Sequence, residues 1–325
     1  MAALRRKTIT IILILFITAA FLIAGGMAFL LQRSIGPCPG DQGKRQQVRA
    51  FLQRVYGAEM VRFPSSDGTP LAGFLITRPK SRGTVVLCHG YRHSKEWMAR
   101  YIRLFPEYTI LAFDFRASGQ SGGSFSSIGY YESNDVRGAI AYLQKRFGPQ
   151  SCRPLIVLGV SMGAAAALKA ASELRVGVDG LILDSPYAQL SDIIRESMHQ
   201  FSCVPAWLSP WVQKVAALLL GPVLSMHPER DAARLSIPTF LIHSRSDSIT
   251  NPSHSVRLFA RLYKNKGSAA WLWLTPPARH AASFLSCPRE YEKRVRTFLE
   301  KILRSFRVAR LRSLAGFAAK KQLSD

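Results

Sequence analysis

The chain has 325 residues, of which 48% are hydrophobic, and its 44 Lys and Arg against 20 Asp and Glu give a formal net charge of +24. This length fits one large α/β domain or two small ones, and the apolar content argues against extended disorder. The positive charge favours acidic partners, but no zinc finger or aromatic-interleaved basic motif is present, so we do not expect nucleic acid as a partner.

An uncharged apolar run occupies residues 8–31. At 1.5 Å per residue it is long enough to cross a hydrocarbon layer of about 30 Å, and it exceeds the roughly 7–15 apolar residues of a cleaved secretory signal, which is the alternative. We therefore predict a single-pass membrane anchor over residues 1–35. Arg5, Arg6 and Lys7 precede the run and favour a cytoplasmic N terminus with the main domain on the extracytoplasmic side, although basic residues also follow the run.

The five cysteines show no paired spacing, so neither a disulfide framework nor a zinc site is expected. Cys88 lies in an apolar run and is interpreted as a core residue. His89 and His93 are four positions apart, but no Glu completes a zinc signature. Nothing in the sequence requires a metal or another cofactor.

Residues 36–57 are predicted to form a linker followed by a short basic helix, and the main domain is predicted to span residues 58–300. Asp67 and Gly68 favour a tight hairpin turn between strands at 58–63 and 71–77. From residue 84 onwards, short apolar runs alternate with helical stretches, which indicates strands buried on both faces of a mostly parallel sheet. These runs predict an α/β fold and occupy residues 84–88, 109–113, 155–160, 181–183, 239–242 and 270–274.

Two further segments are open to two interpretations each. Residues 187–228 are longer than an ordinary crossover and form either additional helical packing or a lid with an apolar underside. The basic tail, residues 301–325, places Ile302, Leu303 and Phe306 on one helical face that Arg307 interrupts. This tail either contacts anionic lipid or forms a solvated helix.

The sequence from Gly159 to Gly163 reads Gly-Val-Ser-Met-Gly, directly after a buried apolar run and directly before an alanine-rich stretch. A serine on a sharp turn between a strand and a helix is exposed as a nucleophile, and small residues on either side let the two elements approach closely. Ser161 is therefore a candidate nucleophile. The alternative is a glycine-rich turn without chemistry.

Together with Leu87-Cys88-His89-Gly90-Tyr91 and the Asp-x-Arg block at Asp114–Arg116, this turn resembles the α/β-hydrolase superfamily, and more closely its lidded esterase and serine-aminopeptidase-like branch. The resemblance covers about residues 58–300. It implies a mostly parallel central sheet with helices on both faces and a helical lid insertion at about 187–228.

In that superfamily the catalytic residues follow the order Ser, Asp or Glu, His along the chain. The resemblance therefore implies Ser161 as nucleophile, Asp247 as the orienting acid and His280 as general base. Asp184, which follows the preceding strand, is the competitor for the acid. His280 is favoured over the other histidines because it alone follows the last predicted strand.

The resemblance also implies that the backbone N–H groups of Tyr91 and Met162 form the oxyanion hole. Three positions depart from the family pattern, because Ala117, Ser244 and Arg279 stand where glycine is usual. These departures concern loop shape and leave the substrate unspecified.

The predicted function is that of a membrane-anchored serine hydrolase that cleaves a carboxylic ester, or a thioester, with a lipidic or aromatic acyl group through an acyl-enzyme. Its expected partners are a small acyl substrate and the membrane, and the oligomeric state is not predicted. One alternative is a serine aminopeptidase-like amide hydrolase that binds a free amino terminus through Glu132 or Asp135. The other is a non-catalytic anchored scaffold with the same fold.

Overall fold

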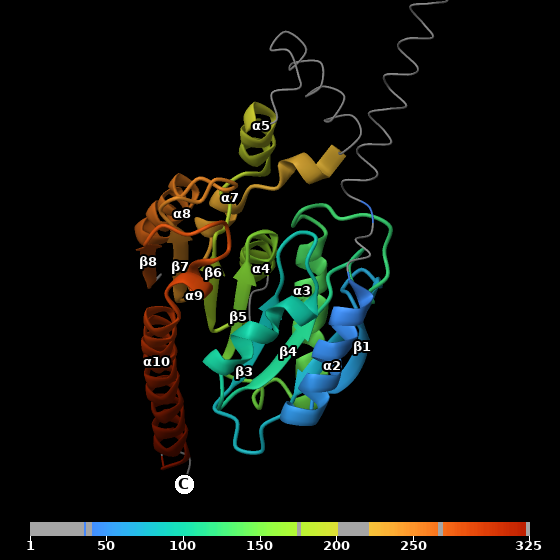
Figure 1. Cartoon of the computed structure of the whole chain (residues 1–325). Helices are drawn as coiled ribbons and strands as arrows, with labels where there is room; N and C mark the ends of the chain where they lie inside the picture. The colour runs from blue at the N-terminus through green and yellow to red at the C-terminus, as the bar shows by residue number, and fades with distance from the viewer. Residues whose placement is uncertain (1–35, 37–40, 174–176, 201–220, 266–268, 323–325) are drawn as a thin grey trace, which may run out of the picture.

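The computed structural model describes residues 36, 41–173, 177–200, 221–265 and 269–322. In this part of the chain a single eight-stranded sheet has the order β1-β2-β4-β3-β5-β6-β7-β8 (Figure 1). The strands are β1 Glu59–Pro64, β2 Pro70–Ile76, β3 Thr84–Cys88, β4 Thr109–Phe113, β5 Leu155–Val160, β6 Gly180–Asp184, β7 Thr239–Ser244 and β8 Ala270–Thr275. Every strand predicted from the apolar runs is present.

The sheet begins with an antiparallel entry and continues as a parallel sheet. β2 pairs antiparallel with both β1 and β4, and β4, β3, β5, β6, β7 and β8 then pair in parallel with their neighbours. The predicted hairpin turn lies between β1 and β2, where the Ser65 N–H donates to the Thr69 carbonyl at 2.8 Å and Gly68 has a φ of +89°. Gly68 suits this position because a left-handed φ costs glycine little.

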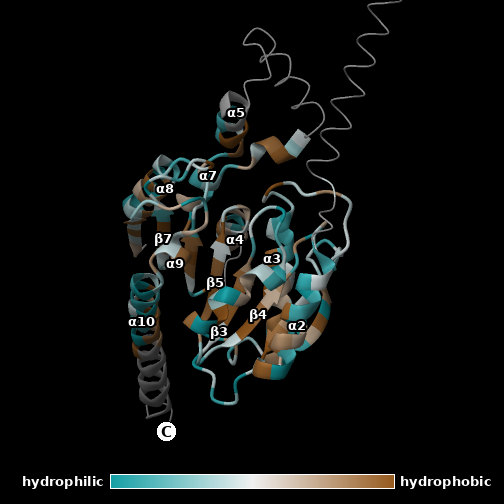
Figure 2. Cartoon of the chain, in the orientation of Figure 1, coloured by the Kyte–Doolittle hydropathy of each residue, from teal (hydrophilic) through white to brown (hydrophobic). Residues whose placement is uncertain are grey.

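Helices cover both faces of the sheet and create two separate hydrophobic cores. One core contains side chains of α3 (Glu132–Phe147), α4 (Met162–Glu173) and α8 (Ser253–Lys264). The other contains side chains of α2 (Gln42–Tyr56), the 3₁₀ helix η1 (Lys95–Leu104) and α10 (Pro288–Gln322). Neighbouring strand residues alternate between the two cores, as Val85 and Val86 do, and the central strands are hydrophobic in Figure 2. The predicted α/β architecture is confirmed.

The short basic helix predicted within residues 36–57 is α2, which begins at Gln42. Asp41 caps it, because its carboxylate accepts a hydrogen bond from the Lys44 N–H at 3.1 Å. Gly57 ends the helix in the left-handed conformation, with a φ of +64°.

The last helix, α10, runs continuously across the domain boundary that was predicted at residue 300. Ile302 and Leu303 are only 3% and 5% exposed, and a Cβ at Gly180 would lie 2.3 Å from Ile302 Cδ1. The start of the apolar face that suggested membrane binding is therefore part of the core. The side chains of residues 309–322 lie outside the described part of the structure.

The predicted lid region contributes α5 (Leu190–Gln200), the 3₁₀ helix η2 (Gly221–Ser225) and α7 (Pro228–Ala232). A small apolar cluster that includes Tyr187, Leu190 and Met226 attaches this region to Ala165 of α4. Residues 201–220, and the predicted anchor at 1–35, lie outside the described residues. Among the helices of the described ranges, none is long and apolar enough to span a bilayer.

Candidate active site

Ser161 occupies a strained turn between the end of β5 and the start of α4. Its φ is +54°, in the left-handed region, which costs a residue other than glycine about 1–2 kcal/mol. The turn is held from both sides, because the Ser161 N–H donates to the Asp184 carbonyl at 2.8 Å and the Ser161 carbonyl accepts from the Ala164 N–H at 2.9 Å. The parallel neighbour strand and the helix thus maintain a conformation that the chain would otherwise avoid.

The glycines on either side of Ser161 are required by close backbone packing. A Cβ at Gly163 would lie 2.4 Å from the Cys88 carbonyl oxygen and 2.5 Å from that of His89. A Cβ at Gly159 would lie 2.5 Å from the Gly163 carbonyl oxygen. Helix α4 can therefore approach β3 and β5 only because both positions lack a side chain, which is the packing that the sequence motif predicts.

The structure brings Ser161, His280 and Asp247 together in one hydrogen-bonded chain. His280 lies on the loop between β8 and the short helix α9 (Ser283–Ser286). Its Nε2 is 2.8 Å from Ser161 Oγ, and its Nδ1 is 2.7 Å from Asp247 Oδ2. This is the spacing that general-base activation of a serine requires.

Asp247 is buried and held by several donors. Its Oδ1 accepts hydrogen bonds from the backbone N–H groups of Ile249 and Thr250, each at 2.9 Å. The Nε2 of His243, which donates to the Thr250 carbonyl at 2.8 Å, also lies 3.3 Å from Asp247 Oδ2. Burial alone would raise the pKa of Asp247, but the hydrogen bonds from His243, His280 and Thr250 outweigh it and hold that pKa well below its usual range.

Asp184, the competing acid, has a different set of contacts. Its carboxylate is fully buried and accepts from the Tyr291 hydroxyl and from Ser185 Oγ, both at 3.0 Å. Burial raises the pKa of Asp184. Its carboxylate therefore connects the sheet to α10, and Asp247 is the acid that contacts His280.

Backbone groups suited to an oxyanion hole lie beside the serine. Met162 is the first residue of α4, so the helix offers no carbonyl to its N–H. The turn at Gly90 and Tyr91 lies against the elbow, because a Cβ at Gly90 would be 3.6 Å from Ser161 Cβ. His89 shapes that turn, since its Nε2 accepts from the Phe115 N–H at 3.0 Å and its Nδ1 therefore donates to the Gly90 carbonyl at 2.7 Å. Burial lowers the pKa of His89, in keeping with a neutral ring.

Ser161 and His280 open into a cavity of about 570 Å³. Its walls are largely apolar and include Ile128, Ile193 and Leu285. Tyr91 and Met162 also line it, so the two predicted oxyanion donors belong to the same cavity as the serine. This volume is within the usual range for a small-molecule site.

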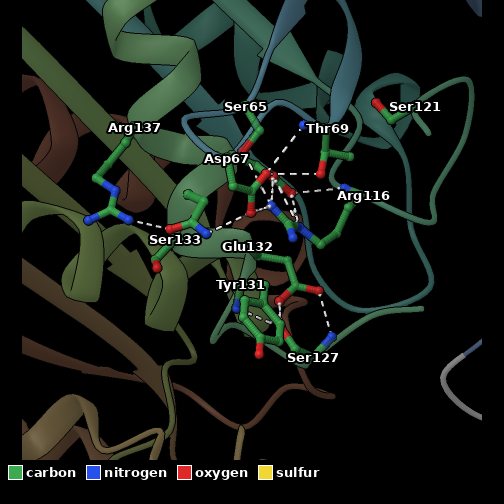
Figure 3. Close-up of polar contacts among 12 residues, drawn as sticks. Ser65, Asp67, Thr69, Arg116, Ser121, Ser127, Tyr131, Glu132, Ser133 and Arg137 are labelled. Atoms are coloured by element: carbon green, nitrogen blue, oxygen red, sulfur yellow. Dashed lines mark hydrogen bonds and ion pairs between the residues drawn. The ribbon is translucent and has the colours of Figure 1, made fainter. Parts of the chain in front are cut away.

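Glu132 and Asp135, which the sequence offered for binding a free amino terminus, are engaged within the protein. Figure 3 shows the contacts of Arg116 with Asp67 and of Glu132 with Ser127. The Arg116 guanidinium bonds Asp135 through Nη2 at 2.6 Å and also contacts Asp67 at 2.7 Å. Glu132 accepts hydrogen bonds from the Ser127 N–H at 2.9 Å and the Gly129 N–H at 2.8 Å. The amine-binding hypothesis for these two residues is wrong, because both are buried and saturated with internal donors.

Glu132 has a different relation to the site, which sequence reasoning missed. The turn that it holds contains Ile128, one wall of the cavity, and Ile128 has a φ of +53°. The Tyr187 hydroxyl donates to the Ile128 carbonyl. Glu132 thus positions an apolar wall of the cavity, and only the cluster of serines before it in the sequence gave a hint of this.

Two of the departures from the family pattern also have structural consequences. Ala117 has a φ of +53°, which explains why glycine is usual at that position. Ser244 Oγ donates to the Ala278 carbonyl at 2.7 Å and accepts from the Ala278 N–H at 2.8 Å. The serine therefore ties the end of β7 to the loop that carries His280.

Comparison with known proteins supports this description of the fold. A sequence profile of the family described as "Serine aminopeptidase, S33" matches residues 79–229, which include Tyr91 and Ser161 but end before Asp247 and His280. The uncharacterized protein YqkD of Bacillus subtilis is 28% identical over 73% of this chain and 77% of its own length. The protein bem46 of Schizosaccharomyces pombe is 25% identical over 66% of this chain and 74% of its own.

Solved structures extend the similarity to the whole fold. The Pyrococcus furiosus esterase Pf2001 is 25% identical, with a TM-score of 0.64 over 82% of this chain and 98% of the esterase. The Pyrococcus horikoshii acylaminoacyl peptidase, at 19% identity, shares the fold with a TM-score of 0.55 over 75% of this chain and 40% of the peptidase. The sheet topology, the family profile and the similarity to the esterase show that the chain has the α/β-hydrolase fold.

Proposed function

We propose that the protein is a serine hydrolase that cleaves carboxylic esters through an acyl-enzyme. The observation that carries the proposal is the hydrogen-bonded chain from Ser161 through His280 to Asp247, at 2.8 and 2.7 Å, inside a largely apolar cavity. The similarity to an archaeal esterase supports ester bonds as the target. A scaffold would have no need to keep this geometry intact.

In the acylation step, Ser161 Oγ attacks the carbonyl carbon of the ester and His280 Nε2 takes the hydroxyl proton. Asp247 accepts from His280 Nδ1–H, which fixes the tautomer and stabilises the imidazolium that forms. The negative charge on the former carbonyl oxygen is stabilised by the N–H groups of Tyr91 and Met162. When the C–O bond breaks, His280 returns the proton to the leaving alcohol.

Deacylation repeats these roles with water as the nucleophile. His280 takes one proton from the water, whose oxygen attacks the acyl carbon, and the same two N–H groups stabilise the second tetrahedral intermediate. Collapse releases the carboxylic acid and returns the proton to Ser161 Oγ. Each turnover therefore consumes one ester and one water and yields one alcohol and one acid.

The charges that line the cavity favour an esterase over an aminopeptidase. No Asp or Glu side chain of the described residues lines the cavity, whereas Arg100 and Arg279 do. A substrate with a free, positively charged amino terminus would find like charge there and no carboxylate to pair with. An amide hydrolase that binds a free amine is accordingly the second candidate, and a short-chain 4-nitrophenyl ester should be cleaved much faster than an alanine 4-nitroanilide.

A fluorophosphonate probe tests the activated serine directly. We expect the parent protein to be labelled, and Ser161→Ala and His280→Ala to lose the label, because one removes the nucleophile and the other removes its base. A folded parent that takes up no probe and cleaves neither the ester nor the anilide would favour the scaffold alternative. Circular dichroism of the parent and both variants provides the check on folding.

The proposal includes attachment to a membrane through residues 1–35, with the hydrolase domain on the extracytoplasmic side. It rests on the uncharged run at 8–31 and on the basic residues before it. Basic side chains near an anionic bilayer would add about 1 kcal/mol each. The full chain should resist extraction from membranes by alkaline carbonate, and protease added outside sealed cells should digest the domain. Release by carbonate would refute the anchor.

A further inference from the structure

The catalytic cavity has an excess of positive charge that the proposed reaction does not use. Arg100, from η1, and Arg279, directly before His280, both line it, and no carboxylate of the described residues does. An ester bond is neutral, so its hydrolysis requires neither guanidinium. Both positions therefore need another explanation.

Arg100 differs from most other partly buried arginines of the described structure in lacking an acidic partner. Its Nε donates to the Trp97 carbonyl at 3.1 Å, and its guanidinium lies over the Trp97 ring, 4.2 Å from the ring centre. Desolvation lowers the pKa of Arg100, whereas carboxylate partners raise the pKa of Arg116 and Arg153. Stacking on Trp97 holds the group in place and leaves donors for an external acceptor.

Arg279, the residue directly before His280, is in a similar situation. Within the described residues, its side chain forms no hydrogen bond, ion pair or ring contact, and it is exposed. Glycine is the usual residue at this position in the family that the sequence resembles. An arginine here adds a long cationic side chain next to the general base.

A second, shallower groove of about 340 Å³ extends the positive surface outward from the cavity. The two hollows share His93, Trp97 and Arg100, and Arg45 of α2 also lines the groove. The acidic residues of the groove are already paired with basic residues of this chain. Asp41 lies 3.6 Å from Lys44 Nζ, and buried Glu96 lies 3.0 Å from Arg49 and 3.3 Å from Lys95. The remaining charge of the groove is therefore positive.

We propose that this cavity binds an ester that carries a negatively charged oxyanion, a phosphate or a carboxylate, and that Arg100 and Arg279 are the side chains that hold it. The inference rests on the proposed hydrolase function and specifies its substrate class. A guanidinium forms two parallel hydrogen bonds to such a group, which gives orientation as well as attraction. The apolar part of the cavity around Ile128, Ile193 and Leu285 accepts the uncharged portion of the same substrate.

The test measures binding rather than turnover, with the full chain carrying Ser161→Ala in a neutral detergent. Two matched pairs of esters separate the sources of the anion. The first pair is 4-nitrophenyl adipate monoester and its uncharged terminal amide, and the second is 1-hexanoylglycerol 3-phosphate and 1-hexanoylglycerol. We expect the charged member of at least one pair to bind roughly tenfold or more tightly than its neutral partner, since charge-assisted hydrogen bonds are the strong ones. Added salt should reduce that preference.

The combined variant Arg100→Gln with Arg279→Gln should bind both members of each pair within about threefold of one another. The matched control is Arg103→Gln on the same helix, an exposed arginine that stacks on Phe284 and lines neither hollow. The control should keep the full preference. Equal binding of charged and neutral esters by the Ser161→Ala protein would overturn the inference, and so would a preference that survives removal of both arginines.

These outcomes are separate from failure of the proposed function. If the parent takes up the fluorophosphonate probe and hydrolyses the neutral esters, but its Ser161→Ala form shows no preference for charge, only the substrate class is wrong. If the Ser161→Ala protein prefers the charged ester through Arg100 and Arg279 while the parent reacts with no probe or ester, the hydrolase function is wrong and the anion site stands.

Discussion

Replacing Asp247 by Asn removes one charge and should change the tautomer of His280 without moving the backbone. Asp247 Oδ1 accepts two backbone N–H bonds, from Ile249 and Thr250. In Asp247→Asn the amide oxygen remains at these donors, because an NH₂ group there would meet two donors and leave them unpaired. The NH₂ group then faces His280 Nδ1, 2.7 Å away in the parent.

An NH₂ group can only donate, so His280 Nδ1 must become the acceptor and the ring proton must move to Nε2. Nε2 is the atom 2.8 Å from Ser161 Oγ, and once protonated it cannot take the serine proton. The equivalent change in a well-studied serine protease lowers kcat about 10⁴-fold. At about 1.36 kcal/mol per tenfold, this corresponds to roughly 5 kcal/mol of barrier.

The assay is hydrolysis of a short-chain 4-nitrophenyl ester at saturating substrate, with kcat as the readout. Asp184→Asn is the matched control, because Asp184 is also buried, at the end of β6, but contacts Tyr291 and Ser185 rather than His280. We expect the control to change the melting temperature while kcat stays within about tenfold of the parent. If Asp247→Asn lost less than tenfold while Asp184→Asn lost a thousandfold or more, the assignment of the acid would be refuted.

Three further variants probe the packing around the site. Gly163→Ala should lower the free energy of unfolding by about 1–3 kcal/mol or more, because its Cβ would meet backbone oxygens at 2.4 and 2.5 Å. Thermal unfolding measures this loss of stability, and an unchanged melting temperature would contradict the prediction. Glu132→Gln should raise KM several-fold and destabilise by about 1–3 kcal/mol, since an NH₂ group would face backbone donors that now bond the carboxylate. Arg257→Ala removes ion pairs to Asp192 of α5 and Glu229 of α7. Because the arginine is partly exposed, we expect at most about 1 kcal/mol of global destabilisation but faster hydrogen exchange in α5. Unchanged hydrogen exchange in α5 would show that these ion pairs do not hold the helix in place.

The sheet and the turn at Ser161 were predictable because local patterns encode both. Runs that are apolar on both faces identify buried parallel strands, and Gly159 and Gly163 mark a turn in which helix and strand approach closely. The residues of the turn and the strand before it are neighbours in the chain. A sequence pattern can therefore describe this part of the site without knowledge of distant contacts.

The boundary at residue 300 was harder to place, because the same residues suit two environments. Ile302 and Leu303 form an apolar helical face that would equally fit a lipid surface. In the structure this face packs against the sheet, with Ile302 against Gly180. The contact of Ile302 with Gly180 of β6, which is far away in the sequence, decides between a lipid surface and the protein core.

The roles of acidic residues depend still more on distant partners. Glu132 and Asp135 are suitable amine ligands by residue type, and nothing near them in the sequence shows that they are occupied. Arg116 reaches Asp135 from the loop after β4, and the backbone donors to Glu132 come from a turn with left-handed residues. Each buried carboxylate needs specific hydrogen-bond donors to offset the free-energy cost of its desolvation. Only the folded chain therefore shows which carboxylates already have their donors.

The same reasoning explains why the net charge of +24 said little about the site. Several buried and half-buried arginines are paired, as Arg116 is with Asp135 and Arg153 is with Asp179. Such pairs are neutral to a substrate and contribute to folding alone. A charge becomes available for recognition only where the fold supplies no counter-charge. Arg100 stacks on Trp97 and has no acidic partner among the described residues, so it meets that condition next to the candidate nucleophile. The selectivity of the cavity is therefore set by which charges the fold leaves unpaired, and the total charge of the chain carries no information about it.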